Sequence, residues 1–272
     1  MIKVCFIYDG ETNEKFLEIL SKMTPNRSGK WKDMVGVTKI EEADWCVVID
    51  STTQSVPLDR TIFVSAHPKM SDDYPSYVDN TDKPYRLDNA ETFGFGEWWV
   101  NFSYDALSAM KRPNKSNKTC YIVSNTSGKW GRSDRKEFAK MLSNDIGIYG
   151  RIQDVGRGEL GINTPDAYWF GKEDVLRDHK YSVEVDHGFC KHYFSERVFD
   201  SLLMWCMPLY WGCTNIEDYL PKECFKYIDI YGDGQDVINP PEPNYKAIAE
   251  ARDMLLNKYQ IWAWTHAYIK GL

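Results

Sequence analysis

The chain has 272 residues, 43% hydrophobic and 27% charged, which is typical of folded soluble proteins and argues against disorder, a collagen-like repeat or a coiled coil. Its 40 acidic and 33 basic side chains give a net charge of −7, so the basic footprint of a nucleic-acid-binding protein is missing and we expect no nucleic-acid partner. At roughly 150 residues per domain, the length fits two domains or one large one.

Nothing in the sequence predicts a secretion signal or a membrane anchor. The apolar run before Asp9 is too short for either, and no later stretch approaches the roughly 18 uninterrupted apolar residues of a spanning helix. The seven cysteines include no Cys-x-x-Cys pair, so neither a disulfide framework nor a zinc ribbon is indicated. We therefore expect a soluble, cytoplasmic protein with no membrane span and reduced cysteines.

The first part of the chain alternates strand and helix patterns. Residues 2–8 form an apolar run that the turn signal Asp9-Gly10 closes, and residues 14–23 carry apolar side chains at helical spacing. Two further apolar runs, 45–50 and 61–65, predict strands. Strands alternating with helices indicate a mostly parallel sheet and an α/β fold.

A basic, polar stretch with a proline, residues 111–118, predicts a linker between two α/β domains, 1–115 and 116–272. The alternating pattern then starts again. The predicted elements are a strand at 119–124, a helix at 135–142, a strand at 146–149 and a long helical end at 245–272.

The most informative stretch runs from His179 to Phe225. A predicted strand, 180–186, precedes a helix for which Ser195 is the expected N-cap. The first turn of a helix exposes free N–H groups and the positive end of the dipole, so it is suited to a phosphate. Arg197 adds a planar cation that matches phosphate oxygens.

Several motifs in this stretch resemble those of the α-1,3-fucosyltransferases, glycosyltransferase family 10. They are Tyr193-Phe-Ser-Glu-Arg197, Phe199-Asp-Ser-Leu-Leu203, Met207-Pro-Leu-Tyr-Trp-Gly212 and Asn215-Ile-Glu-Asp-Tyr-Leu-Pro221, in the family's order. Weaker matches upstream are Ser124-Asn125, an arginine (Arg135 or Arg132) that opens a helix, and Tyr149-Gly150. In the first domain only Tyr85-Arg-Leu-Asp-Asn89 and Phe93-Gly94 match.

The resemblance implies a GT-B fold, in which two Rossmann-like domains face a cleft and terminal helices pack back on the N-terminal domain. The C-terminal domain would bind the nucleotide-diphosphate sugar and the N-terminal domain a glycan or glycoprotein acceptor, with no metal or other cofactor. The chain looks like a short, soluble member of bacterial or large-DNA-virus type. Its one Asp-x-Asp-like pair, Glu184-Val-Asp186, has both acids on the same face of a predicted strand.

The resemblance also implies the roles of individual residues. Arg197 and Arg135 would hold the diphosphate, Tyr193 would contact the nucleotide, and Glu196 the sugar ring or its developing positive charge. The full set of expected donor-binding residues is Arg135, Arg132, Arg197, Tyr193, Ser195, Asp186, His187, Ser124, Asn125, Tyr149 and Gly150. Glu196 could instead simply complement the helix dipole, and Arg135 could be a solvated surface cation.

Two departures from the family affect the chemistry. The family's Phe-Glu-Asn is Val185-Asp186-His187 here, a change that bears on which donor sugar is recognised. The resemblance implies GDP-fucose as the donor, and UDP-xylose is the alternative. The family's catalytic glutamate is replaced in Ser65-Ala-His-Pro68, which leaves Asp73, then Asp72, then His67 as the expected general base.

The sequence therefore predicts an inverting, metal-independent glycosyltransferase. Loss of the family's glutamate also permits an inactive glycan- or nucleotide-binding module. A hydrolase built on two carboxylates is disfavoured, since the acids lie beside a phosphate-type site that a glycosidase does not need.

Overall fold

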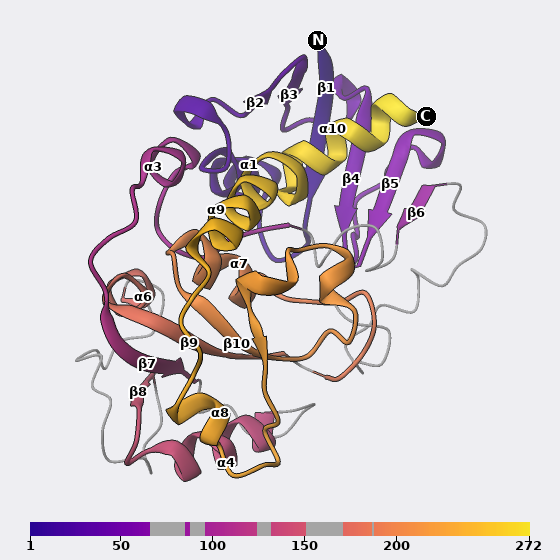
Figure 1. Cartoon of the computed structure of the whole chain (residues 1–272). Coiled ribbons are helices and arrows are strands. Elements are labelled where there is room, and N and C mark those ends of the chain that lie inside the picture. The colour runs from indigo at the N-terminus through magenta and orange to yellow at the C-terminus, as the bar shows by residue number, and fades with distance from the viewer. Residues whose placement is uncertain (66–84, 88–95, 124–131, 151–170, 187) are drawn as a thin grey trace. The chain divides into compact units, whose positions relative to one another are not determined.

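The computed structural model describes residues 1–65, 85–87, 96–123, 132–150, 171–186 and 188–272 (Figure 1). These residues form two compact units, each with its own sheet. Unit 1 comprises residues 1–97, 102–110 and 255–272, and unit 2 comprises residues 98–101 and 111–254.

The sheet of unit 1 has the strand order β2-β3-β1-β4-β5-β6. All neighbours pair in parallel except β2 and β3, which form a short antiparallel hairpin. The strands are β1 (Ile2–Ile7), β2 (Lys30–Trp31), β3 (Met34–Gly36), β4 (Trp45–Ile49), β5 (Thr61–Val64) and β6 (Tyr85–Leu87). The predicted strands at 2–8, 45–50 and 61–65 are confirmed as β1, β4 and β5.

The helices of unit 1 are α1 (Asn13–Ser21), α3 (Tyr104–Ala109) and α10 (Ile261–Gly271), with 3₁₀ turns at Pro25–Arg27, Ile40–Glu42 and Leu58–Arg60. Thr12 caps α1 as its side chain accepts from the Lys15 N–H. Trp262 of α10 is fully buried, and its indole N–H donates to the Leu20 carbonyl at 2.9 Å. This contact holds α10 against α1 within unit 1.

The sheet of unit 2 has the order β11-β10-β9-β7-β8 and is parallel throughout. Its strands are β7 (Ser116–Ile122), β8 (Gly147–Tyr149), β9 (His179–Val185), β10 (Met207–Trp211) and β11 (Lys226–Tyr227). Its helices are α4 (Arg132–Leu142), α6 (Lys172–Asp178), α7 (Glu196–Leu203), α8 (Gln235–Ile238) and α9 (Tyr245–Met254), with 3₁₀ turns at Ile216–Asp218 and Lys222–Cys224. In Figure 1, α4 and α8 lie below this sheet, and α7 and α9 lie above it. The α/β class, with a mostly parallel sheet in each unit, is thus confirmed.

The predicted helical end is interrupted. A π-helical turn, Leu255–Tyr259, follows α9, and the extended residue Gln260 separates it from α10. Gln260 caps α10 by accepting from the Trp262 N–H at 2.9 Å. The apolar spacing predicted helix correctly, but it did not show this break.

The predicted linker at 111–118 is wrong in its second half, because β7 begins at Ser116. Lys115 is also held in place. Its ammonium donates to the carbonyls of Leu176 (2.5 Å) and His179 (2.9 Å) at the end of α6, where carbonyls lack partners within the helix. A lysine that looks like a solvated linker residue is thus a C-terminal cap.

The topology of unit 2 indicates where a ligand would bind. The chain passes from β7 to β8 on one side and places β9 on the other side of β7. In parallel α/β sheets ligands bind beyond the carboxyl ends of the strands, at the point where the strand order reverses. That point lies between β7 and β9.

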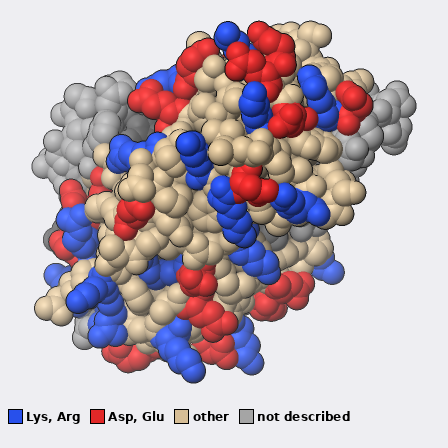
Figure 2. All heavy atoms as spheres, turned by 90° about the horizontal axis from the view of Figure 1, so that it is seen from above, with Lys and Arg blue, Asp and Glu red and all other residues tan. Residues whose placement is uncertain are grey.

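Two further observations concern the molecular surface. In the described part of the chain, no helix is both long and apolar enough to cross a membrane. On the face drawn in Figure 2 the described acidic and basic side chains are interspersed, and no basic stripe gathers there.

Candidate functional site in unit 2

The side chain of Asp186 organises the carboxyl edge of the unit 2 sheet. It follows β9 directly, is fully buried, and accepts hydrogen bonds from the Ser195 hydroxyl and the Tyr210 hydroxyl (2.5 Å). The Ser195 N–H also donates to it, at 3.3 Å. The Tyr210 oxygen in turn accepts from the Cys213 N–H at 2.6 Å. One carboxylate therefore joins the end of β9 to the start of α7 and the end of β10.

Two glycines are needed at this edge because no side chain fits. A Cβ on Gly212 would lie 2.7 Å from the Asp186 Cβ. Gly150, after β8, has φ +113° and a Cβ there would lie 2.1 Å from the Val123 carbonyl oxygen. These contacts explain the Trp-Gly and Tyr-Gly pairs physically.

The first turn of α7 has the geometry of an anion site. Ser195 is the N-cap, as predicted, and its hydroxyl accepts from the Arg197 N–H at 3.4 Å. Glu196 and Arg197 occupy the first helical positions and are partly exposed. The N-terminus of a helix carries the positive end of the helix dipole, which favours an anion.

Arg135 of α4 adds a second cation to this place. Its side chain is buried, the residue being only 4% exposed, and its Nε and Nη2 atoms have no hydrogen-bond partner among the described residues. Burial and the nearby Arg197 lower the pKa of Arg135 to about 10, although Asp186 and Glu196 act in the opposite direction. An anion would supply hydrogen-bond partners for this buried guanidinium and would balance the charges of the two arginines.

Acidic side chains approach from the sheet. Ser182, Glu184 and Asp186 alternate along β9 and so share a face, as predicted for the two acids. Glu184 accepts from the hydroxyls of Ser182 (2.5 Å) and Ser201. Burial raises the pKa of the Glu184, Asp186 and Glu196 carboxyls.

A buried ion pair joins α7 to α6. Lys172 of α6 donates to Asp200 of α7 at 2.6 Å, and Asp200 also accepts from the N–H groups of Trp99 (2.7 Å) and Val100 (3.1 Å). Burial disfavours the charged form of Lys172, but Asp200, Glu184 and Glu196 outweigh it and its pKa is raised.

The structure brings together six of the predicted site residues. They are Arg135, Asp186, Tyr193, Ser195, Glu196 and Arg197, which lie at hydrogen-bond distance from one another or within mutual electrostatic range. Tyr149 is separate from them. Its hydroxyl lies 3.4 Å from the His179 Nε2, at the amino end of β9, whereas Asp186 lies beyond the carboxyl end.

Several predicted residues lie outside the described part of the chain. These are Asp73, Asp72, His67, Ser124, Asn125 and His187, and the side chain of Arg132 is also not described. Their roles remain predictions.

Sequence reasoning missed Lys172, Asp200 and Tyr121. Tyr121 of β7 is buried against Phe138 of α4, and its hydroxyl has no partner among the described residues. It lies just before the carboxyl end of β7, but the predicted strand, 119–124, placed it in the first half, so the sequence offered no such signal. Nothing in the sequence pairs Lys172 with Asp200, because the contact joins two helices that are distant along the chain.

No cluster suited to a metal ion is found in the residues that the structure describes. His192, near Cys190, instead contacts the Tyr219 hydroxyl and the Asn215 amide (3.0 Å) in a loop. These contacts join the loop before α7 to residues 215–219.

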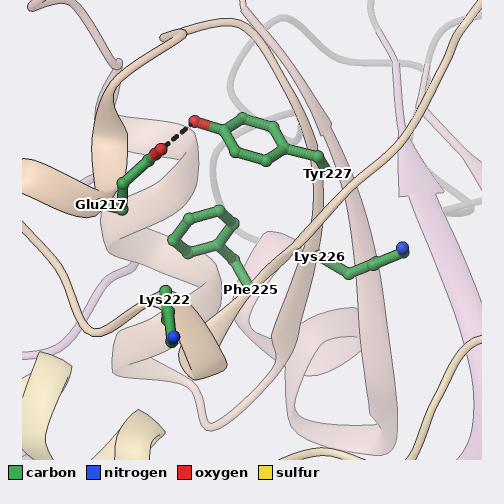
Figure 3. Close-up of a pocket in the computed structure, with 5 residues that line it drawn as sticks. All are labelled: Glu217, Lys222, Phe225, Lys226 and Tyr227. Carbon is green, nitrogen blue, oxygen red and sulfur yellow. Dashed lines mark hydrogen bonds between the residues drawn. The ribbon is translucent and has the colours of Figure 1, made fainter.

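Unit 2 also has a shallow pocket of about 270 Å³ (Figure 3). The Tyr227 hydroxyl donates to Glu217 at 2.7 Å and is 2.9 Å from the Cys213 carbonyl. Figure 3 shows Lys226 pointing away from the Phe225 ring. The polar groups of this pocket bond to each other, and these hydrogen bonds join the two ends of the 213–227 segment.

Comparison with known proteins identifies the family. The model for the C-terminal part of glycosyltransferase family 10 (fucosyltransferase) matches residues 112–252, just over half of the chain. The chain belongs to glycosyltransferase family 10. The matched range contains every element of the site described above, so the resemblance seen in the sequence is confirmed at the level of the family.

Solved structures similar to this family 10 chain include the following three. An α1,3-fucosyltransferase is 13% identical, with a TM-score of 0.41 over 96% of this chain and 91% of its own. Its complex with GDP-fucose is 13% identical, with a TM-score of 0.42 over 95% of this chain and 82% of its own. A mutant of T4 phage BGT with UDP-glucose has a TM-score of 0.48 at 11% identity, over 99% of both chains. With TM-scores below 0.5, these likenesses carry no weight in assigning a ligand. Comparison with curated protein sequences gives no significant match.

Proposed function

We propose that this chain is an inverting, metal-independent glycosyltransferase that moves a sugar from a nucleoside diphosphate to a hydroxyl of a glycan. The observation that carries the proposal is that Arg135 of α4 lies near Arg197 in the first turn of α7. Two cations and a helix N-terminus converge where the strand order of a parallel sheet reverses.

The proposed reaction is a single displacement. A base removes the proton of the acceptor hydroxyl, the acceptor oxygen bonds to the anomeric carbon, and the bond to the diphosphate breaks with its electron pair. Arg135 and Arg197 would bind the departing diphosphate, so that its charge is matched without a metal ion. Glu196 would face the sugar, where a carboxylate stabilises developing positive charge.

The structure suggests a different role for Asp186 within this proposal. Both of its oxygens already accept from Ser195 and Tyr210. We therefore assign it as a positioning residue that fixes the start of α7 and, with it, the position of Arg197. Tyr149, whose hydroxyl is bonded to His179, would likewise be a positioning residue and would not touch the donor.

GDP-fucose is the proposed donor, supported by the family to which the chain belongs. UDP-xylose remains the alternative. Asp73 is the proposed base, ahead of Asp72 and His67. A bacterial or viral source and a cytoplasmic location remain predictions.

The test is release of nucleoside diphosphate from a panel of nucleotide sugars mixed with candidate glycans, in the presence of EDTA. Turnover of one donor, lost in Arg197→Ala, is expected. No release from any donor, with nucleotide binding intact, would favour an inactive binding module. Asp73→Asn should then abolish turnover at unchanged donor affinity if Asp73 is the base, whereas unchanged turnover would exclude it.

A further inference from the structure

Two of the exposed aromatic side chains in the described residues lie together at the carboxyl edge of unit 2. Phe189, after β9, is 56% exposed, and Tyr231, after β11, is 69% exposed. Trp211, at the end of β10, is half-buried between them. Its ring centroid lies 5.4 Å from that of Phe189 at 30° and 6.1 Å from that of Tyr231 at 84°. We call these three residues the aromatic surface.

The aromatic surface adjoins the candidate donor site. The Tyr231 hydroxyl donates to Asp134 at 3.2 Å, and Asp134 precedes Arg135 in α4. Trp211 follows Tyr210, which bonds to Asp186. A ligand on these rings would therefore lie beside the residues assigned to the diphosphate.

The chemistry of the surface favours a neutral carbohydrate. Exposed rings offer flat apolar faces on which the C–H faces of a sugar can stack. Asp229 accepts from the Tyr231 N–H at 2.9 Å and is exposed, so two carboxylates border the rings. Carboxylates accept hydrogen bonds from sugar hydroxyls and repel phosphate groups, so the charge favours a neutral ligand over an anionic one.

We propose that the aromatic surface binds a neutral glycan chain, as part of the acceptor. Its role as acceptor site rests on the proposed glycosyltransferase function, whereas glycan binding itself does not. This would place an acceptor contact on the nucleotide-binding unit, in addition to the N-terminal one that the family resemblance implies.

The test measures binding of the full chain to a printed array of neutral glycans without donor, followed by titration of the best glycan by NMR. The wild type should retain a glycan, and Phe189→Ala/Tyr231→Ala should weaken it about five- to tenfold, the effect of losing two ring contacts. Tyr231→Phe keeps the ring and should bind within about twofold of the wild type. Tyr8→Ala removes an exposed aromatic side chain of unit 1 and serves as the matched control.

Three results would overturn the inference. The first is a wild type that retains no glycan, and the second is a double variant that binds glycan as well as the wild type. The third is a double variant that loses affinity for GDP or UDP instead, which would point to the nucleobase. Failure of the proposed function looks different, because no form of the protein would then turn over any donor, whatever the array shows.

Discussion

Arg135 illustrates how a residue can be placed for a ligand at the expense of its own solvation. The sequence left open a solvated surface cation or a phosphate ligand, and the structure buries it with two nitrogen atoms unpartnered among the described residues. The sequence showed that Arg135 begins a helix ahead of Phe138. It could not show that Arg135 is buried, because burial depends on which face of α4 packs against the sheet.

Arg135→Met tests this placement. The variant should lose at least about tenfold in affinity for pyrophosphate, the loss of one charge-assisted contact. Its thermal midpoint should change by only a few degrees, because Nε and Nη2 make no hydrogen bond to the described residues. The comparison uses calorimetric titration and thermal unfolding. Undiminished pyrophosphate affinity would show that Arg135 is not part of the anion site.

The acids of β9 should give stability a defined pH dependence. Burial raises the folded-state pKa of Glu184, so the folded protein binds its proton more tightly than the unfolded chain does. The stability that this group contributes is present below its unfolded pKa and is lost as pH rises through its folded pKa.

Glu184→Gln removes that titration while keeping an oxygen for Ser182 and Ser201. The free energy of unfolding of the variant, relative to wild type, should therefore improve as pH rises through the folded pKa. Urea unfolding across the acid to neutral range measures this. A difference that stays constant with pH would show that the Glu184 pKa is not shifted by folding.

Among the elements, α7 connects the fold to the site. The sequence predicted its start at Ser195 and its apolar side chains, but α7 also buries the polar residues Asp200 and Ser201. Their partners, Lys172 and Glu184, lie on α6 and β9. Helical spacing identifies one helix at a time, so it could not show that polar groups on separate elements would satisfy each other.

Ser195→Ala tests whether the start of α7 is set by its cap. The change removes the N-cap acceptor and one donor to the buried Asp186, and we expect it to lower the free energy of unfolding by about 1–3 kcal/mol. It should also weaken nucleotide binding, as the helix start would no longer be fixed. Ser195→Thr retains the hydroxyl and should recover most of both losses. Equal behaviour of the two variants would argue that the cap is unimportant.

At the scale of the whole molecule, repeated strand and helix patterns predicted two α/β units, each with a mostly parallel sheet. The short strands β2, β3, β6 and β11 were not predicted, since two or three residues rarely show a readable period. The packing of the terminal helices on the N-terminal domain was implied by the family resemblance and not by the apolar pattern, and residues 255–272 belong to unit 1. Local patterns determined the units, whereas contacts between distant segments completed them.

The account depends on a diphosphate site at the start of α7. The most direct test is calorimetric titration of the wild type with GDP, UDP and pyrophosphate in EDTA, repeated on Arg197→Ala. Arg177→Ala is the matched control, because Arg177 is an exposed arginine of unit 2 that pairs with Asp174 on the surface. We predict that one nucleoside diphosphate binds to wild type and control alike, and at least about tenfold more weakly to Arg197→Ala. Failure of the folded wild type to bind any of the three ligands, or equal affinity in Arg197→Ala, would contradict the account.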